Sequence, residues 1–188
     1  MFISHVDAAL EKLLRTRLPL AEEYGDVSFD VPNATWSAQL SRITVNLFLY
    51  DVQRSNQPSR SVTTRPGDGP AMRRRPQPMI QLGYLVSAWA GSPRDEHQLL
   101  SDVVSLLTGL ELVPSDLVSP DLTSSVQLLL GDERSTGREL WTAAGGTLRP
   151  AVCLRATVAA DTFDWELTPP SVERISAMAE RMKGAGGA

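Results

Sequence analysis

Arginines are concentrated in one segment of this chain, between residues 54 and 75. The segment contains Arg54, Arg60, Arg65, Arg73, Arg74 and Arg75. A guanidinium group stays charged and donates paired hydrogen bonds to a carboxylate, so this pattern favours recognition of an acidic surface over catalysis. Residues 52–76 carry a net charge of +5, because Asp68 is their only acid, and the remaining residues carry −9. We therefore treat the six arginines as candidate partner contacts.

Two other interpretations of the arginine segment stay open. A solvated loop that only keeps the chain soluble would have the same polar, proline-rich composition. Nucleic-acid binding is the least favoured, because the segment has no aromatic residue to stack on bases and the whole chain has a formal charge of −4. The composition thus favours a protein partner and no nucleic acid.

The histidines and the single cysteine do not form a catalytic or metal-binding pattern. His5 and His97 lie on predicted helices, and neither has a second ligand at metal-binding spacing. Both are expected to be solvated side chains on helix surfaces. Cys153 is the only cysteine and lies in the apolar run 151–154. We expect a buried structural thiol there and no intrachain disulfide.

Two polar segments resemble ligand-binding loops but lack essential residues. The acids Asp161, Asp164 and Glu166 lack the glycine and the closing glutamate of a calcium loop, so a solvated strand end is expected. Residues 131–137 look like a nucleotide loop without its lysine. No P-loop, dinucleotide-binding glycine pattern or serine-nucleophile elbow is present. We expect no enzyme, metal or cofactor, with an enzyme of unrecognised type as the alternative.

The elements that must position these residues follow from hydrophobic periodicity and capping signals. Helices are predicted over residues 3–17, from Ser92 to Gly109, and over 171–183. A further short helix is predicted to begin at a capping box formed by Thr136 and Glu139 and to carry Leu140 and Trp141. Strands are predicted over 27–31, 43–52, 79–90, 126–130 and 151–159. The strand at 27–31 ends at a proline, which suits a sheet edge, and the strand at 79–90 is apolar on both faces, which suits the sheet centre. Trp36 and Leu40 are expected to pin the segment 34–42 to the core.

The strand at 43–52 has two different faces. Ile43, Val45, Leu47 and Leu49 form one apolar face, whereas Thr44, Asn46, Phe48 and Tyr50 form the other. The second face becomes apolar only in its later half. That half is expected to be covered either by another element or by another subunit, so Phe48 and Tyr50 are candidate subunit-interface residues.

The order of elements predicts an α+β (mixed α/β) fold, with helices packed on a largely antiparallel mixed sheet. We expect a single domain over 1–168, followed by a C-terminal helix and flexible tail over 169–188. Within the domain, residues 52–78 are predicted to be a mobile loop, because their prolines and arginines bury too little apolar surface to offset the entropy of ordering. No secretory signal or membrane-spanning run is visible, so a cytoplasmic chain without membrane insertion is expected.

Several runs of the sequence resemble one family of assembly proteins. The most specific are Thr-Val-Asn-Leu-Phe-Leu-Tyr-Asp at 44–51 and Tyr-Leu-Val-Ser-Ala-Trp at 84–89, and further similarity lies at 6–10, 27–32, 95–100, 139–141 and 148–151. Over residues 3–165 the chain is similar to the N-terminal domain of cap, or tail-terminator, proteins of extracellular contractile injection systems. These phage-tail-like particles include the Photorhabdus virulence cassettes and the antifeeding prophage.

The resemblance implies a tail-terminator-like fold and a non-enzymatic structural role. A cap of this kind ends polymerisation of tube and sheath, holds the distal end as a homo-hexameric ring, and has the sheath and inner-tube proteins as partners. Phe48 and Tyr50 would then lie between subunits, and the arginine segment would contact tube or sheath. The alternative is a non-enzymatic binding module whose arginine loop 54–75 docks on an acidic partner elsewhere.

Overall fold

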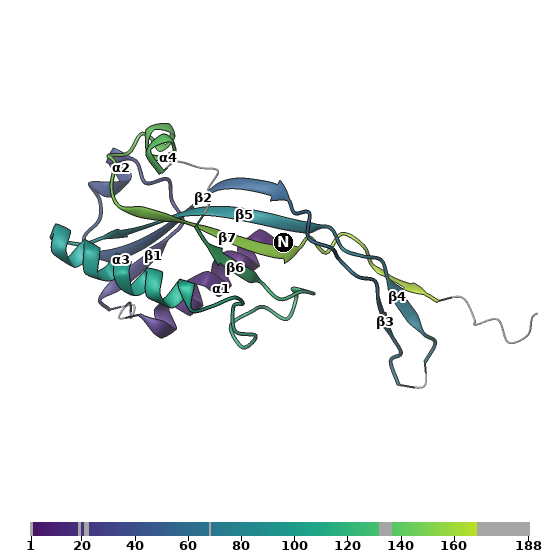
Figure 1. Cartoon of the computed structure of the whole chain (residues 1–188). Helices are drawn as coiled ribbons and strands as arrows, with labels where there is room; N and C mark the ends of the chain where they lie inside the picture. Colours follow the sequence, from purple (N-terminus) through teal and green to yellow (C-terminus); the bar gives the residue numbers. More distant parts are fainter. Residues whose placement is uncertain (1, 19, 21–22, 68, 132–136, 169–188) are drawn as a thin grey trace, which may run out of the picture.

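A five-stranded sheet forms the centre of the structure, a computed structural model that describes residues 2–18, 20, 23–67, 69–131 and 137–168 (Figure 1). Its strands, in spatial order, are β1 (Gly25–Ser28), β2 (Ile43–Arg54), β5 (Met79–Trp89), β7 (Ala151–Ala159) and β6 (Gln127–Leu130). β1 runs parallel to β2, and the other neighbours are antiparallel. The predicted mixed α/β fold with a largely antiparallel sheet is confirmed, as are the edge position of the first strand and the central position of β5.

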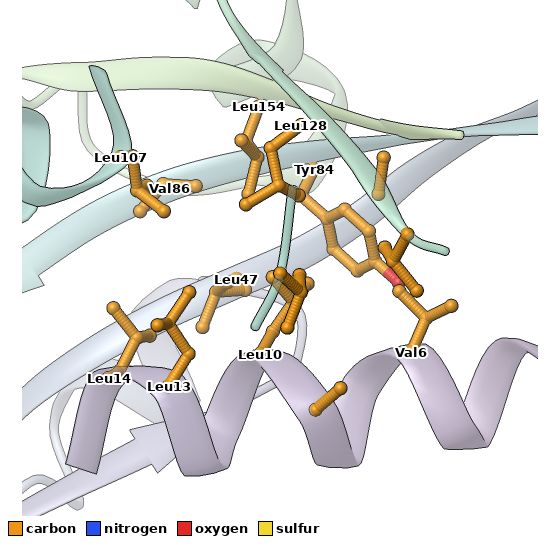
Figure 2. Close-up of a cluster of buried hydrophobic side chains, with 14 of the residues drawn as sticks. Val6, Leu10, Leu13, Leu14, Leu47, Tyr84, Val86, Leu107, Leu128 and Leu154 are labelled. Atoms are coloured by element: carbon orange, nitrogen blue, oxygen red, sulfur yellow. The ribbon is translucent and has the colours of Figure 1, made fainter. Parts of the chain in front are cut away.

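Two long helices, α1 (Phe2–Arg17) and α3 (Pro93–Thr108), lie on one face of this sheet, as Figure 1 shows. The main hydrophobic core lies between them and the sheet. Figure 2 shows side chains of α1 pointing toward the strands, among them Val6, Leu10, Leu13 and Leu14, all fully buried. Burial of each such leucine or valine contributes about 1.5–3 kcal/mol. The apolar spacing that predicted α1 is therefore what attaches it to the sheet.

Helix α3 begins and ends at the residues that its capping pattern predicts. The side chain of Ser92 accepts a hydrogen bond from the backbone N–H of Asp95 at 3.3 Å, and Pro93 opens the first turn. Gly109 is the C-terminal cap.

None of the described helices combines the length and the apolar composition that a membrane span needs.

Short helices α2 (Ala34–Ser37) and α4 (Gly137–Ala144) lie on the opposite face of the sheet (Figure 1). They enclose a second, smaller core around Leu85, Trp89 and Trp141. Trp36 and Leu40 pack against this core, so the prediction that they pin the segment 34–42 is confirmed. The proposed Thr136 cap and the predicted helix over 171–183 lie outside the described residues.

The alternation predicted along β2 is confirmed. Val45 and Leu47 are fully buried in the main core, whereas Phe48 and Tyr50 pack against the second core. The pairing of β2 with β5 shifts register between Leu49 and Asp51, so Tyr50 forms a bulge. Opposite the bulge, Gly83 leaves room for the Tyr50 ring, since a Cβ there would lie 3.1 Å from the ring Cζ.

The first strand is shorter than predicted, because β1 ends at Ser28 rather than at residue 31. After Ser28 the backbone is held by a side chain instead of a strand partner. The Nδ2 of Asn46 donates to the carbonyl of Asp30 at 3.0 Å, and Asn33 then caps α2. Periodicity cannot separate such a side-chain-bound segment from a true strand.

Residues 52–78, predicted to be a mobile loop, contain regular strands. β2 continues to Arg54, and the segment then forms a hairpin of β3 (Val62–Thr64) and β4 (Met72–Arg74). Strand β8 (Trp165–Leu167) joins β4 and completes a three-stranded sheet. Proline content misled the prediction because the prolines flank these short strands, and because β8 comes from a distant part of the sequence. The mobility of the segment stays a prediction.

We call residues 55–78 and 161–168 together the arm. Figure 1 shows it projecting beyond one end of the five-stranded sheet. Gln77 is the only buried residue that the structure describes within 55–78. The arm therefore contributes little to the core and mainly presents surface.

A buried tyrosine links the central strand to α1 and should make stability depend on pH. The Oη of Tyr84 donates to Asp7 at 2.7 Å, and burial, with the hydrogen bond and charge of Asp7, raises the pKa of Tyr84. Because the folded state keeps the phenol proton and the unfolded state loses it above about pH 10, wild-type stability falls as pH rises above that value.

We expect Tyr84→Phe to cost about 1–3 kcal/mol at pH 7, through loss of a hydrogen bond to a carboxylate. The variant should also lose less stability than wild type between neutral pH and about pH 11. Urea unfolding at a series of pH values measures both effects. An identical alkaline decline in the two proteins would contradict the assignment.

Candidate functional site

The arm presents two chemically different faces, because side chains of β3, β4 and β8 alternate across its sheet. Register places Thr63, Arg73 and Glu166 side by side on one face. The other face carries apolar side chains that are unusually exposed: Val62 at 55%, Trp165 at 39% and Leu167 at 67%. Exposed apolar side chains gathered at one place indicate a surface for a partner.

Five of the six arginines predicted as partner contacts are exposed on or beside the arm, Arg75 among them. Arg54 ends β2, Arg60 and Arg65 flank β3, and Arg73 lies in β4. Their charges face solvent, where they can meet an acidic surface. Partner contact by these residues stays a prediction.

Arg74 is better explained as a structural residue than as a partner contact. Its side chain is only 12% exposed, and its Nε donates to the carbonyl of Phe163 at 2.6 Å. Its Nη2 lies 3.7 Å from Asp161, and its guanidinium carbon lies 5.8 Å from the centre of the Trp165 ring. The guanidinium is therefore used within the chain, joining β4 to the segment before β8.

Arg75 has both an internal partner and open surface. Its Nε donates to Glu166 at 3.0 Å, and its guanidinium carbon lies 5.0 Å from the centre of the Phe163 ring. Because the side chain remains 59% exposed, this pair adds little stability and can rearrange on binding. The sequence pattern placed Arg73, Arg74 and Arg75 in one group, whereas the structure gives the three different roles.

The acids near the end of the described chain are part of the arm rather than a ligand site. Asp161 contacts Arg74 and accepts from the hydroxyl of Thr123, and Glu166 contacts Arg75. Among the residues that the structure describes, no three histidine, cysteine, aspartate or glutamate side chains are arranged to hold a metal ion. The acids predicted to lie at a solvated strand end lie before and within the exposed strand β8, where Asp161 and Glu166 pair with arginines.

Gln77 joins the two segments of the arm to each other, and sequence reasoning missed it. Its Oε1 accepts hydrogen bonds from the backbone N–H groups of Thr162 and Phe163 at 2.7 and 3.0 Å. Its Nε2 donates to the carbonyl of Phe163 at 2.7 Å. The Gln77 side chain is only 7% exposed. Because the chain turns at Asp161, which has a φ of 48°, the amide group of Gln77 takes the place of a backbone hydrogen-bond partner there. No local pattern signals such a glutamine.

We expect Gln77→Ala to loosen the arm without unfolding the domain. Three buried hydrogen bonds are lost, which costs about 1–3 kcal/mol for the groups left unpaired. Hydrogen exchange at the amides of Thr162 and Phe163 should accelerate, while exchange in β5 and β7 should not change. Gln57→Ala, at an exposed position, is the matched control. Unchanged exchange at both amides would contradict this role.

Phe48 and Tyr50 are half-buried against the second core, beside Leu85 of β5. Three tryptophans stack edge to face in this region, with Trp36 5.2 Å from Trp89 and Trp89 6.1 Å from Trp141 between ring centres. This packing favours cover by another element of the same chain, one of the two predicted possibilities. A subunit interface at the exposed remainder of both side chains stays a prediction.

The remaining sequence candidates lie apart from one another. His5 lies on α1, 3.8 Å from Asp121, and His97 is exposed on α3. Cys153 is half-buried in β7, beside the second core, rather than fully buried. Residues 132–136 of the segment that looks like a nucleotide loop lie outside the described part of the chain. Helix α4 ends at Ala144, just before Gly145, whose φ is 69°. These residues form no common site.

The fold of this chain is similar to that of two solved proteins. One is the sheath/tube terminator of PVC, an extracellular contractile injection system, solved in the extended state. The two structures have a TM-score of 0.61 and 21% sequence identity, and the match covers 98% of this chain and 65% of that chain. The other is the anti-feeding prophage cap, which terminates that particle's tube, with a TM-score of 0.61, 18% identity, and cover of 93% and 60%. The chain thus spans under two-thirds of either protein.

Residues 5–174 match the family model described as the Pvc16 N-terminal domain, and the chain belongs to this family. No curated protein matches the sequence. The resemblance on which the sequence prediction rested is thereby confirmed, and it extends over nearly all of the described chain.

Proposed function

We propose that this protein is a structural cap that terminates the tube and sheath of a contractile, phage-tail-like particle. The observation that carries the proposal is the match of residues 5–174 to the Pvc16 N-terminal domain. The shared fold supports it, because nearly the whole chain superposes on two proteins that terminate such particles.

The proposed mechanism follows from the geometry of polymer ends. Tube and sheath grow through head-to-tail contacts between subunits. Growth stops when a subunit binds the growing end through one surface and has no second surface to which another subunit can bind. The exposed face of the arm, with Val62, Trp165 and Leu167, supplies an apolar contact surface. The exposed arginines around it supply charge for an acidic partner. No catalytic step is part of this role.

The finer features of the cap follow from its position on the particle. The partners are the sheath and inner-tube proteins, and the cap itself is a homo-hexameric ring that holds the distal end. Before assembly the chain is cytoplasmic, and it then becomes part of the particle. The alternative, a binding module outside any particle, predicts that the chain does not co-purify with tails.

The test is immunogold electron microscopy of purified particles with an antibody raised against this chain. We expect gold at one end of each particle and not along the sheath. Labelling distributed along the particle would contradict a cap. Complete absence of label would favour the binding-module alternative, and particles lacking the chain are the control for antibody specificity.

A further inference from the structure

The arm has an acidic counterpart at the other end of the molecule. Residues 23–41 contain three charged residues, Glu23, Asp26 and Asp30, and all are acids. This segment includes β1 and the turn that leads to α2. Tyr24 and Val31, which flank β1, are 69% and 42% exposed, so the acidic segment also offers apolar surface.

Both segments also end a sheet among the described strands, although at β1 the Gly25 carbonyl already accepts a hydrogen bond from Arg15 Nη1 at 3.2 Å. β1 is the terminal strand of the five-stranded sheet, and β3 is the terminal strand of the arm's sheet. Arg60 and Arg65 flank β3, and Val62 within it is exposed. A terminal strand has backbone groups on one side without a strand partner, which makes it a template for another chain. The two edges therefore match in backbone chemistry, in apolar side chains and in charge.

The arm cannot reach β1 of its own chain. β1 pairs with Ile43 to Asn46 at the beginning of β2, whereas the arm follows Arg54 at its end. The intervening strand is roughly 25 Å long, and Figure 1 shows the arm directed away from the sheet. Any contact between the two surfaces must therefore join two molecules.

We propose that the arm of one copy, through β3 and its flanking arginines, docks on the acidic β1 edge of the next copy. The two surfaces lie on different parts of the molecule, so the contact is head to tail and repeats around a closed ring. The inference rests on the cap function proposed above and specifies the contact between ring subunits. Charge complementarity favours a second copy, because Arg60 and Arg65 flank the β3 edge, whereas the acids Glu23 and Asp26 lie at the β1 edge.

Sedimentation velocity of the purified full chain tests this contact at about 50 mM salt, where surface charges are weakly screened. Wild type should self-associate as its concentration rises toward about 100 μM. The arm variant Arg60→Glu with Arg65→Glu, and the edge variant Glu23→Lys with Asp26→Lys, should each weaken association about tenfold or more through like-charge repulsion. The matched control, Arg94→Glu with Arg138→Glu, reverses two exposed arginines outside the arm and should associate as wild type does.

Mixing the arm variant with the edge variant gives the most specific result. Each reversed surface then finds an opposite charge on the other variant, so the mixture should recover association that neither variant shows alone. A wild-type chain that stays monomeric throughout, variants that associate normally, or a mixture that does not recover would each overturn the contact. If gold still labels one particle end in that case, only this inference fails, whereas unlabelled particles refute the cap function itself.

Discussion

Replacement of residues 56–78 by Asn-Gly is expected to remove the chain from purified particles while leaving its main domain folded. Ser55 and Met79 already face each other across the two strands, with the N–H of Ser55 donating to the carbonyl of Met79 at 2.8 Å. A two-residue Asn-Gly turn can close such a pair. Since Gln77 is the only buried residue described in 55–78, the five-stranded sheet should keep its cooperative thermal transition.

The loss of binding should be large, because the replacement removes the four exposed arginines of the arm and the Val62 edge together. Loss of a cluster of contact residues typically weakens binding by tenfold or more. Quantitative immunoblotting of purified particles, normalised to sheath protein, measures the effect. Gln77→Ala, which keeps the arm surface but loosens the contact between its two segments, should reduce incorporation less. Normal incorporation of the armless chain would contradict a role for the arm in assembly.

Trp141→Ala is expected to lower the free energy of unfolding by about 3–5 kcal/mol, the usual cost of removing a buried tryptophan. Trp141 is 1% exposed and joins α4 to Trp89 and Leu85 on the second face of the sheet. The chain that follows α4 lies close against the ring, since a Cβ on Gly146 would lie 2.9 Å from Trp141 Cε3. The ring cannot be replaced by a small movement of the helix, so a cavity would remain.

Urea unfolding measures the predicted loss. Leu148→Ala is the control, because Leu148 is 58% exposed and its truncation should change stability by no more than about 0.5 kcal/mol. Trp141→Phe should cost less than Trp141→Ala, since the phenyl ring retains most of the contact with Trp89. Equal effects of Trp141→Ala and Leu148→Ala would show that the second core does not hold α4 in place.

The elements of the core could be predicted because their signals are local. The apolar spacing of α1, the Ser92 and Pro93 cap of α3 and the alternating faces of β2 each reflect burial against one sheet. The same alternation marked Phe48 and Tyr50 as covered residues, and the structure shows tryptophans beside them. These patterns succeed because period and burial are linked within each element.

The arm could not be predicted, because its stability depends on residues far apart in the chain. β4 pairs with the nearby β3 and also with β8, which lies about ninety positions later, as the register of Arg74 with Trp165 shows. Gln77 has no local signal at all, since its three hydrogen bonds go to Thr162 and Phe163. The arginine cluster was visible in the sequence, but only the structure separates Arg74, which is used internally, from the exposed arginines around it.

The measurement that most directly tests the cap function is negative-stain electron microscopy of particles from cells lacking this gene, beside wild type. A terminator stops head-to-tail growth, so its loss should give sheathed tubes of uncontrolled length or tubes whose sheath has detached. The length distribution of several hundred particles per strain decides the result, and a plasmid copy of the gene should restore it. Uniform, intact tails without the gene would contradict the cap function.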